Sequence, residues 1–91
     1  MNPPLSRSLT ICNKRGLHAR ASAKFVTMAS GLDATIEVEK DGNRVCGTSI
    51  MGLMMLGAAM GDSITITADG EGAEEAVAAL AGLVEAKFGE D

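Results

Sequence analysis

The single histidine of this chain, His18, is the side chain best suited to chemistry. It stands in the stretch Gly16-Leu17-His18-Ala19-Arg20, where a polar turn gives way to residues that favour a helix. A helix N-terminus presents unpaired backbone N–H groups and about half a positive charge, which together attract an anion such as phosphate. The same field opposes protonation of a neighbouring imidazole. A ring nitrogen of His18 is therefore kept free to act as a nucleophile.

Arg20 brings a cation to the same place, two residues after His18. Its planar guanidinium could form paired hydrogen bonds to the oxygens of a phosphoryl group. A lone histidine near a helix start is, however, more often a capping or surface residue. The pattern by itself leaves both interpretations open.

Other chemistries find less support in the sequence. Ser22 and Ser30 have no second histidine or Asp–His pair to activate them as hydrolase nucleophiles. No set of Cys, His and carboxylate residues has the spacing of a metal site, and no G-x-x-x-x-G-K-[ST] loop offers a nucleotide site. The sequence therefore predicts no metal and no cofactor, so any phosphoryl donor would be another protein or a small phosphate compound.

Length and composition predict one domain with an aliphatic core. The 91 residues include six Met and two Phe but no Trp or Tyr, so nothing supplies the aromatic faces on which single-stranded nucleic acid stacks. The net charge of −4 also argues against a phosphate-backbone partner. The sequence thus predicts no nucleic-acid binding.

The chain is expected in the cytoplasm, without membrane insertion. No apolar run approaches the roughly 20 residues needed to span a bilayer, and Met1-Asn2-Pro3-Pro4 does not resemble the start of a secretory signal. Cys12 and Cys46 fall in strand-like segments and are predicted to be small buried apolar residues of a reducing compartment.

Hydrophobic periodicity predicts strands and helices that alternate along the chain. Residues 1–6 are expected to form a flexible N-terminal arm, and residues 7–91 a single domain. Within that domain the pattern predicts a strand over 9–12 and a helix over 18–30 that ends at a left-handed Gly31. A hairpin follows, with strands over 34–39 and 44–46 joined by the turn Asp41-Gly42, and then a short helix that is capped by Ser49 and ends near Gly57 or Gly61. The last two elements are a strand over 63–68 and an amphipathic helix over 73–88. This β-α-β-β-α-β-α order predicts an α+β fold in which helices cover one face of a mostly antiparallel four-stranded sheet.

Two stretches of the sequence, residues 16–26 and 49–57, resemble the signature stretches of HPr, the histidine-containing phosphocarrier family of the phosphoenolpyruvate-dependent phosphotransferase system. The resemblance implies an open-faced β-sandwich with three helices on one sheet face. It implies phosphorylation of His18 on Nδ1, assistance of the transfer by Arg20, and regulatory phosphorylation of Ser49. The positions that match the family's docking surface are Ala21, Ile50, Met51 and Met54.

The resemblance also implies partners. They are enzyme I as phosphoryl donor, enzyme II A components as acceptors, and an HPr kinase/phosphorylase acting at Ser49. The protein would then be a monomeric intermediate in phosphotransfer rather than a stand-alone enzyme.

Two departures from the family pattern leave the pathway open. Ala21 stands where the family usually has proline, and Thr48 stands where some relatives have lysine. Proline in a first turn is only pre-organised for the helix, so alanine keeps the helix possible. The alternatives to sugar uptake are a nitrogen-type or regulatory phosphorelay, a non-catalytic interaction module that uses the apolar residues near Ser49, and a small-phosphate hydrolase that uses His18 and Arg20.

Overall fold

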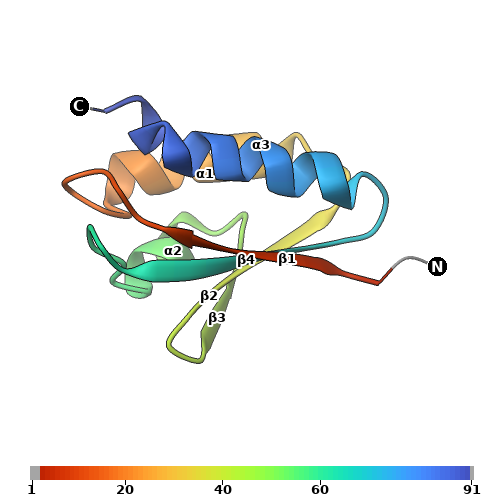
Figure 1. The fold of residues 1–91 in the computed structure, drawn as a ribbon, viewed down its shortest axis with the longest axis horizontal. Helices are drawn as coiled ribbons and strands as arrows, with labels where there is room; N and C mark the ends of the chain where they lie inside the picture. The colour runs from red at the N-terminus through yellow and green to blue at the C-terminus, as the bar shows by residue number, and fades with distance from the viewer. Residues whose placement is uncertain (1–2, 91) are drawn as a thin grey trace.

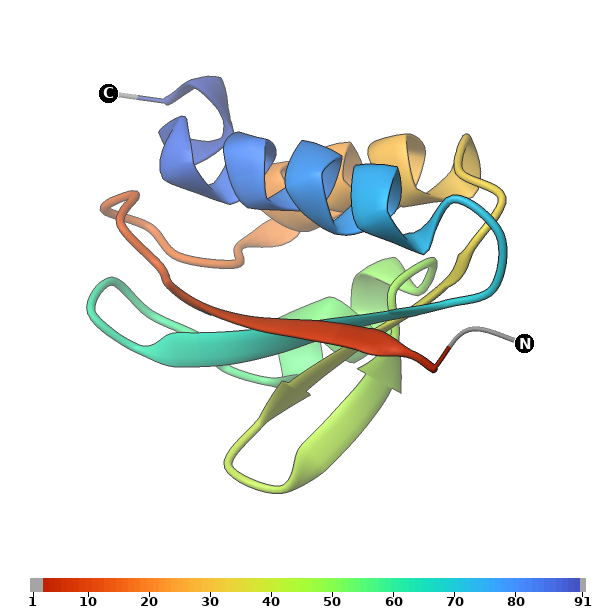
Figure 2. The ribbon, with the colours of Figure 1, turned by 45° about the vertical axis from the view of Figure 1, so that its right-hand side comes forward.

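Four strands and three α-helices build the fold of residues 3–90, the part of the chain that this computed structural model describes. Helices α1 and α3 run side by side over the sheet, and α2 lies beside α1 and β3 (Figures 1 and 2). The opposite face of the sheet is open, as the α+β, open-faced prediction requires. In chain order the elements are β1 (Leu5–Thr10), α1 (Ala19–Ser30), β2 (Thr35–Lys40), β3 (Asn43–Cys46), α2 (Ile50–Met55), β4 (Ser63–Asp69), α3 (Ala73–Glu85) and the short turn η1 (Lys87–Gly89).

The sheet has the strand order β1-β4-β2-β3, and all neighbouring pairs are antiparallel. Asp41 and Gly42 close the β2–β3 hairpin with φ angles of 51° and 84°, the left-handed pair that a two-residue hairpin turn needs. On the open face, hydroxyl groups pair across β1 and β4, for example Ser6 Oγ with Thr67 Oγ1 at 2.9 Å. The predicted hairpin and alternation are confirmed.

The core lies between the sheet and the helices and is mainly aliphatic, as the composition predicts. Alternate residues of β2 and β4 point into it, and α1 and α3 bury one stripe each. Its largest fully buried apolar side chains are Ile11, Phe25, Val38, Leu53, Ile64, Ile66, Leu80, Val84 and Phe88.

Strand β1 begins earlier than predicted. It runs from Leu5 to Thr10 and pairs with β4 along this whole length, so Leu5 and Ser6 belong to the sheet and not to a flexible arm. Residues 1 and 2 of the predicted arm lie outside the described residues. The alternation rule misses the start of this strand because β1 is an edge strand whose residues 5–8 are all exposed and, apart from Leu5, polar, which weakens the hydrophobic pattern.

Helix boundaries differ from the prediction at two ends. Gly31 follows α1 with φ −88°, so the helix ends without a left-handed cap. Helix α3 ends at Glu85, three residues before the predicted end, and Phe88 reaches the core from a left-handed conformation with φ 55° instead of from the helix. An apolar residue at helical spacing looks the same in both cases, which is why the pattern extends the helix too far.

The cysteine prediction is wrong for Cys46, which is exposed at the end of the edge strand β3. Cys12 lies just beyond β1 and is only half-buried, with Sγ 3.3 Å from the Val84 carbonyl oxygen. Strand alternation places a residue on one face or the other, but it does not say which face is covered at an edge.

Replacing Gly16 with alanine should destabilise the protein more than the same change at Gly57, although both glycines have φ 64°. The left-handed conformation costs an alanine roughly 1–2 kcal/mol at either position. A Cβ on Gly16 would lie 2.2 Å from the carbonyl oxygen of Ala58, whereas a Cβ on Gly57 meets no atom within 4 Å. Thermal unfolding of the two variants measures the difference. If the two variants lost equal stability, the backbone before His18 would have shifted enough to relieve the expected clash with Ala58, which would contradict this prediction.

Candidate functional site

His18 is the N-cap of α1 and presents its ring to the first turn of that helix. Its backbone is extended, with φ −73° and ψ −179°, and its Nδ1 atom accepts a hydrogen bond from the backbone N–H of Arg20 at 3.3 Å. The side chain is 15% exposed, so the ring is held and yet reachable. An anion bound at Nδ1 would therefore meet the unpaired N–H groups and the positive end of α1.

The other ring nitrogen of His18, Nε2, forms a hydrogen bond with the side chain of Glu90. Nε2 lies 2.5 Å from Oε2 of Glu90, and Oε1 of Glu90 accepts a hydrogen bond from Nδ2 of Asn13 at 3.0 Å. Asn13 is fully buried and also donates to the carbonyl oxygen of Gly16 at 2.8 Å, which ties the turn before His18 to the same cluster. A carboxylate partner at Nε2 favours the tautomer that carries its proton there and its lone pair on Nδ1.

The pKa of the Glu90 carboxyl lies below its ordinary value, chiefly because Asn13 donates a hydrogen bond to it. Burial opposes this shift, while His18 and the charge of Lys24 add to it. Glu90 therefore stays ionised to a lower pH than an ordinary glutamate. Its contribution to folding is present above its unfolded-state pKa and is lost as the pH falls through the folded-state pKa.

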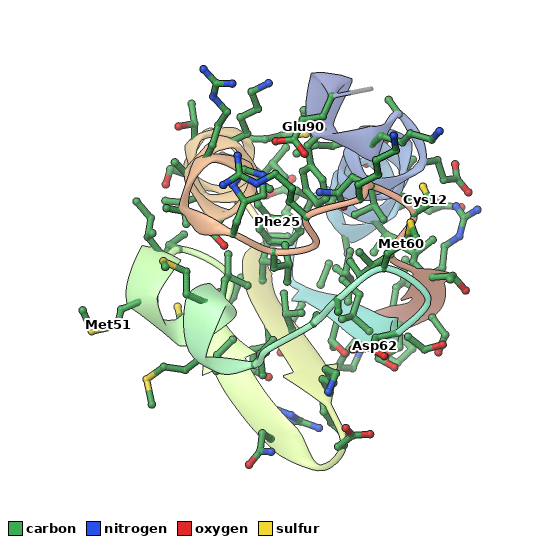
Figure 3. The ribbon with its side chains drawn as sticks, turned by 90° about the vertical axis from the view of Figure 1, so that its left-hand side faces the viewer. Cys12, Phe25, Met51, Met60, Asp62 and Glu90 are labelled. Carbon is green, nitrogen blue, oxygen red and sulfur yellow. The ribbon has the colours of Figure 1, made fainter. Side chains whose placement is uncertain are left out.

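Four basic side chains line a hollow on the Glu90 side of this site. Arg20 is exposed in the first turn of α1, as predicted. With Lys14, Arg15 and Lys24 it lines a shallow hollow that Gly89 and Glu90 complete. Figure 3 shows Glu90 near the ends of the helices, well apart from Met51 on α2. The hollow thus concentrates positive charge beside His18 in a chain whose net charge is −4.

Helix α2 carries an exposed apolar surface, which we call the α2 surface and define as Ile50, Met51, Met54 and Met55. Their exposed fractions are 42%, 72%, 44% and 80%. Met51 projects outward from the helix (Figure 3). Large apolar side chains left uncovered on one helix are typical of a docking site for another protein.

Of the remaining predicted site residues, Ser49 lies where expected and Ala21 does not. Ser49 is the N-cap of α2, as expected, and its Oγ accepts a hydrogen bond from the N–H of Gly52 at 2.9 Å. Ala21 has no exposed area and packs in the core. This burial corrects the prediction that Ala21 contacts a partner, because its side chain offers no surface for docking.

Asn13, Glu90 and Met55 were not among the predicted site residues. Met55 continues the run of apolar residues after Ser49, and that run is the sequence feature that could have placed it in the exposed apolar surface. Asn13 stands in the polar turn before His18, but nothing in its position indicates a carboxylate partner. The contact of Glu90 with His18 depends on the turn at Phe88, which the helical pattern conceals.

Within residues 3–90, no three His, Cys, Asp or Glu side chains are grouped so that they could hold a metal ion. None of the helices in this described part is long and apolar enough to cross a membrane.

Comparison with known proteins finds one family over most of the chain. The sequence model described as "PTS HPr component phosphorylation site" matches residues 5–86. The phosphocarrier protein HPr of Neisseria meningitidis is 50% identical over 86 residues, which cover 94% of this chain and 97% of that protein. The phosphocarrier protein NPr of Shewanella violacea is 44% identical over 86 residues, which cover 94% of both proteins.

The fold shows the same similarity. The crystal structure of HPr-C-His from Thermoanaerobacter tengcongensis superposes with a TM-score of 0.91 at 46% sequence identity. The superposition covers 96% of this chain and 98% of that one.

Proposed function

Because this chain belongs to the HPr family of phosphocarrier proteins of the phosphotransferase system, we propose that it accepts a phosphoryl group on His18 from enzyme I and passes it to an enzyme II A component. One observation carries the proposal. Nδ1 of His18 points at the N-terminus of α1, while Nε2 is bonded to the Glu90 carboxylate. The ring thus directs its Nδ1 lone pair, which accepts the Arg20 N–H in the unphosphorylated protein, to the place where a phosphate is best stabilised.

The transfer would proceed by in-line displacement at phosphorus. The Nδ1 lone pair forms the new N–P bond as the bond between phosphorus and the donor nitrogen of enzyme I breaks, and that electron pair stays on the donor. The proton on Nε2 remains in place beside Glu90. Backbone N–H groups of the first turn and the Arg20 guanidinium would bind the phosphoryl oxygens and stabilise their charge.

Replacing Arg20 with alanine should slow phosphoryl transfer on the order of 100-fold, the usual effect of removing one donor that stabilises transition-state charge. Folding should change little because Arg20 is exposed. Lysine should restore only part of the rate, since it supplies a charge without the planar fork. Rapid-quench measurement of phosphate transfer to an enzyme II A acceptor tests this expectation.

The control for Arg20 is Arg15→Ala, which removes an equal charge from the same hollow but outside the first turn of α1. If the Arg15 and Arg20 variants slowed transfer equally, Arg20 would act only through the general positive field and would not bind the phosphoryl group.

Docking would use the α2 surface and the exposed first turn of α1. Both belong to neighbouring helices, since α1 and α2 are in contact. Regulation would act at Ser49, where a kinase of the HPr kinase/phosphorylase type adds a phosphate at the edge of the α2 surface. The cytoplasm and a monomeric state fit this shuttle role.

Incubation with phosphoenolpyruvate and enzyme I tests the proposal against its alternatives. A stable, acid-labile phosphate on His18 supports a carrier. No incorporation supports a non-catalytic module, and continuous release of phosphate supports a hydrolase.

A panel of acceptors then addresses the pathway. Relatives named HPr match this chain at 44% and 50% identity and a relative named NPr at 44%, a difference too small for overall similarity to select a branch. Transfer to a sugar-specific enzyme II A would support sugar uptake, whereas transfer only to a nitrogen-type enzyme II A would support a regulatory phosphorelay.

A further inference from the structure

The last residues of the described chain form a strap, residues 86–90, that returns from α3 to His18. Lys87 and Phe88 both adopt left-handed conformations, with φ 59° and 55°. Non-glycine residues hold such conformations only where their surroundings enforce them. Here the Phe88 side chain is fully buried, and Lys24 Nζ donates a hydrogen bond to the Phe88 carbonyl oxygen at 2.7 Å. The strap is therefore fastened to both the core and α1.

The strap places Glu90 beside His18, in a partly enclosed position. The Glu90 and His18 side chains are only 16% and 15% exposed. Asn13 holds one carboxylate oxygen and leaves the other for Nε2 of His18. The charged groups facing this pair are Lys14, Arg15, Arg20 and Lys24, which line the same hollow.

We infer that Glu90 is a positioning residue for phosphoryl transfer, holding the proton on Nε2 of His18 in both the free and the phosphorylated protein. The inference rests on the proposed function of His18. In the free protein, this proton leaves the lone pair on Nδ1. In the phosphorylated protein, it decides how well the ring serves as a leaving group.

The leaving-group argument follows from charge balance. When phosphohistidine gives up its phosphoryl group, the N–P bond breaks and its electron pair returns to Nδ1. With a proton on Nε2 the ring departs as neutral imidazole, whereas without it the ring would have to depart as an anion. A carboxylate beside Nε2 favours the protonated, positively charged ring. Glu90 would therefore keep phosphorylated His18 reactive at a higher pH than an isolated phosphohistidine.

Glu90→Gln tests the inference because glutamine keeps the shape and an acceptor for Asn13 but removes the charge. The pH profile for hydrolysis of phosphorylated His18 should move to lower pH by about one unit, and transfer to an enzyme II A acceptor should slow about tenfold on the high-pH side. Glu90→Asp should recover part of both effects. The matched control is Glu85→Gln, which removes a carboxylate from the end of α3 that is 61% exposed and paired with Arg7.

Nuclear magnetic resonance gives a readout that packing alone would not change. In the unphosphorylated wild type, the Nε2 proton of His18 should be protected from exchange and shifted downfield by its bond to the carboxylate, and Glu90→Gln should weaken both properties. Wild-type pH profiles and transfer rates in Glu90→Gln, in a variant shown by its spectrum to be folded, would overturn this inference alone. Failure of the wild type to take phosphate on His18 would instead overturn the proposed function on which it rests.

Discussion

His18→Ala should fold and yet accept no phosphate from enzyme I. The substitution removes the nucleophile, so the expected loss of incorporation is complete. The substitution should lower the free energy of unfolding only modestly. Loss of an N-cap side chain costs about 0.5–2 kcal/mol, and the Glu90 carboxylate loses one of its two partners but keeps Asn13. Radiolabel incorporation from phosphoenolpyruvate and thermal unfolding, measured on the same sample, separate the two effects.

The other capped helix supplies the control. Ser49→Ala removes the N-cap hydrogen bond of α2 by the same physics, so it should lower stability by a similar amount and still allow full phosphorylation. Acid-labile phosphate on His18→Ala would refute the assignment of His18, since this chain has no second histidine to receive it.

Most of the architecture could be predicted because it follows from local periodicity. Strict alternation gave β2 and β4, and the Asp41-Gly42 turn fixed the hairpin between β2 and β3. The edge strand β1 was harder to delimit. Its pairing with β4 uses backbone groups, which any sequence possesses, while its exposed first residues give no apolar pattern.

The chemical centre was predictable to the extent that it is local in sequence. His18, the helix start and Arg20 lie within three residues, and Ser49 directly precedes the helix that it caps. Glu90 lies 72 residues from His18 in sequence, and it reaches the imidazole only because the chain leaves the helical path at Lys87 and Phe88. Such a contact depends on tertiary packing, and no spacing rule along the chain records it.

Phosphorylation of Ser49 should raise the apparent KM for phosphorylation of His18 by enzyme I without unfolding the protein. The Ser49 hydroxyl already accepts a hydrogen bond from the first turn of α2, and a phosphate there can do the same with help from the helix dipole. Helix α2 should therefore remain formed. The effect should fall on docking, because Ile50, Met51 and Met54 are exposed immediately beyond the modified residue.

The size of the effect follows from desolvation. A phosphate adds a charge of about −1.5 to −2, and carrying even part of it into an apolar interface can cost several kcal/mol. Each 1.4 kcal/mol lost in docking lowers affinity about tenfold. Ser49→Asp, with a single charge, should raise KM at least about tenfold, and true phosphoserine should raise it further.

A second control separates the effect of adding a negative charge anywhere on the protein from the effect of placing it at Ser49. Asn43→Asp adds one negative charge without changing side-chain shape, and it does so in the β2–β3 hairpin, at the end of β3 that is farther from Ser49 along the chain. This control should keep the KM of the wild type, as should Ser49→Ala. If Asn43→Asp raised KM as much as Ser49→Asp, the effect would be long-range repulsion and not a charge buried at the α2 surface. If phosphoserine, aspartate and alanine at position 49 all gave the same kinetics, Ser49 would be a helix cap and nothing more.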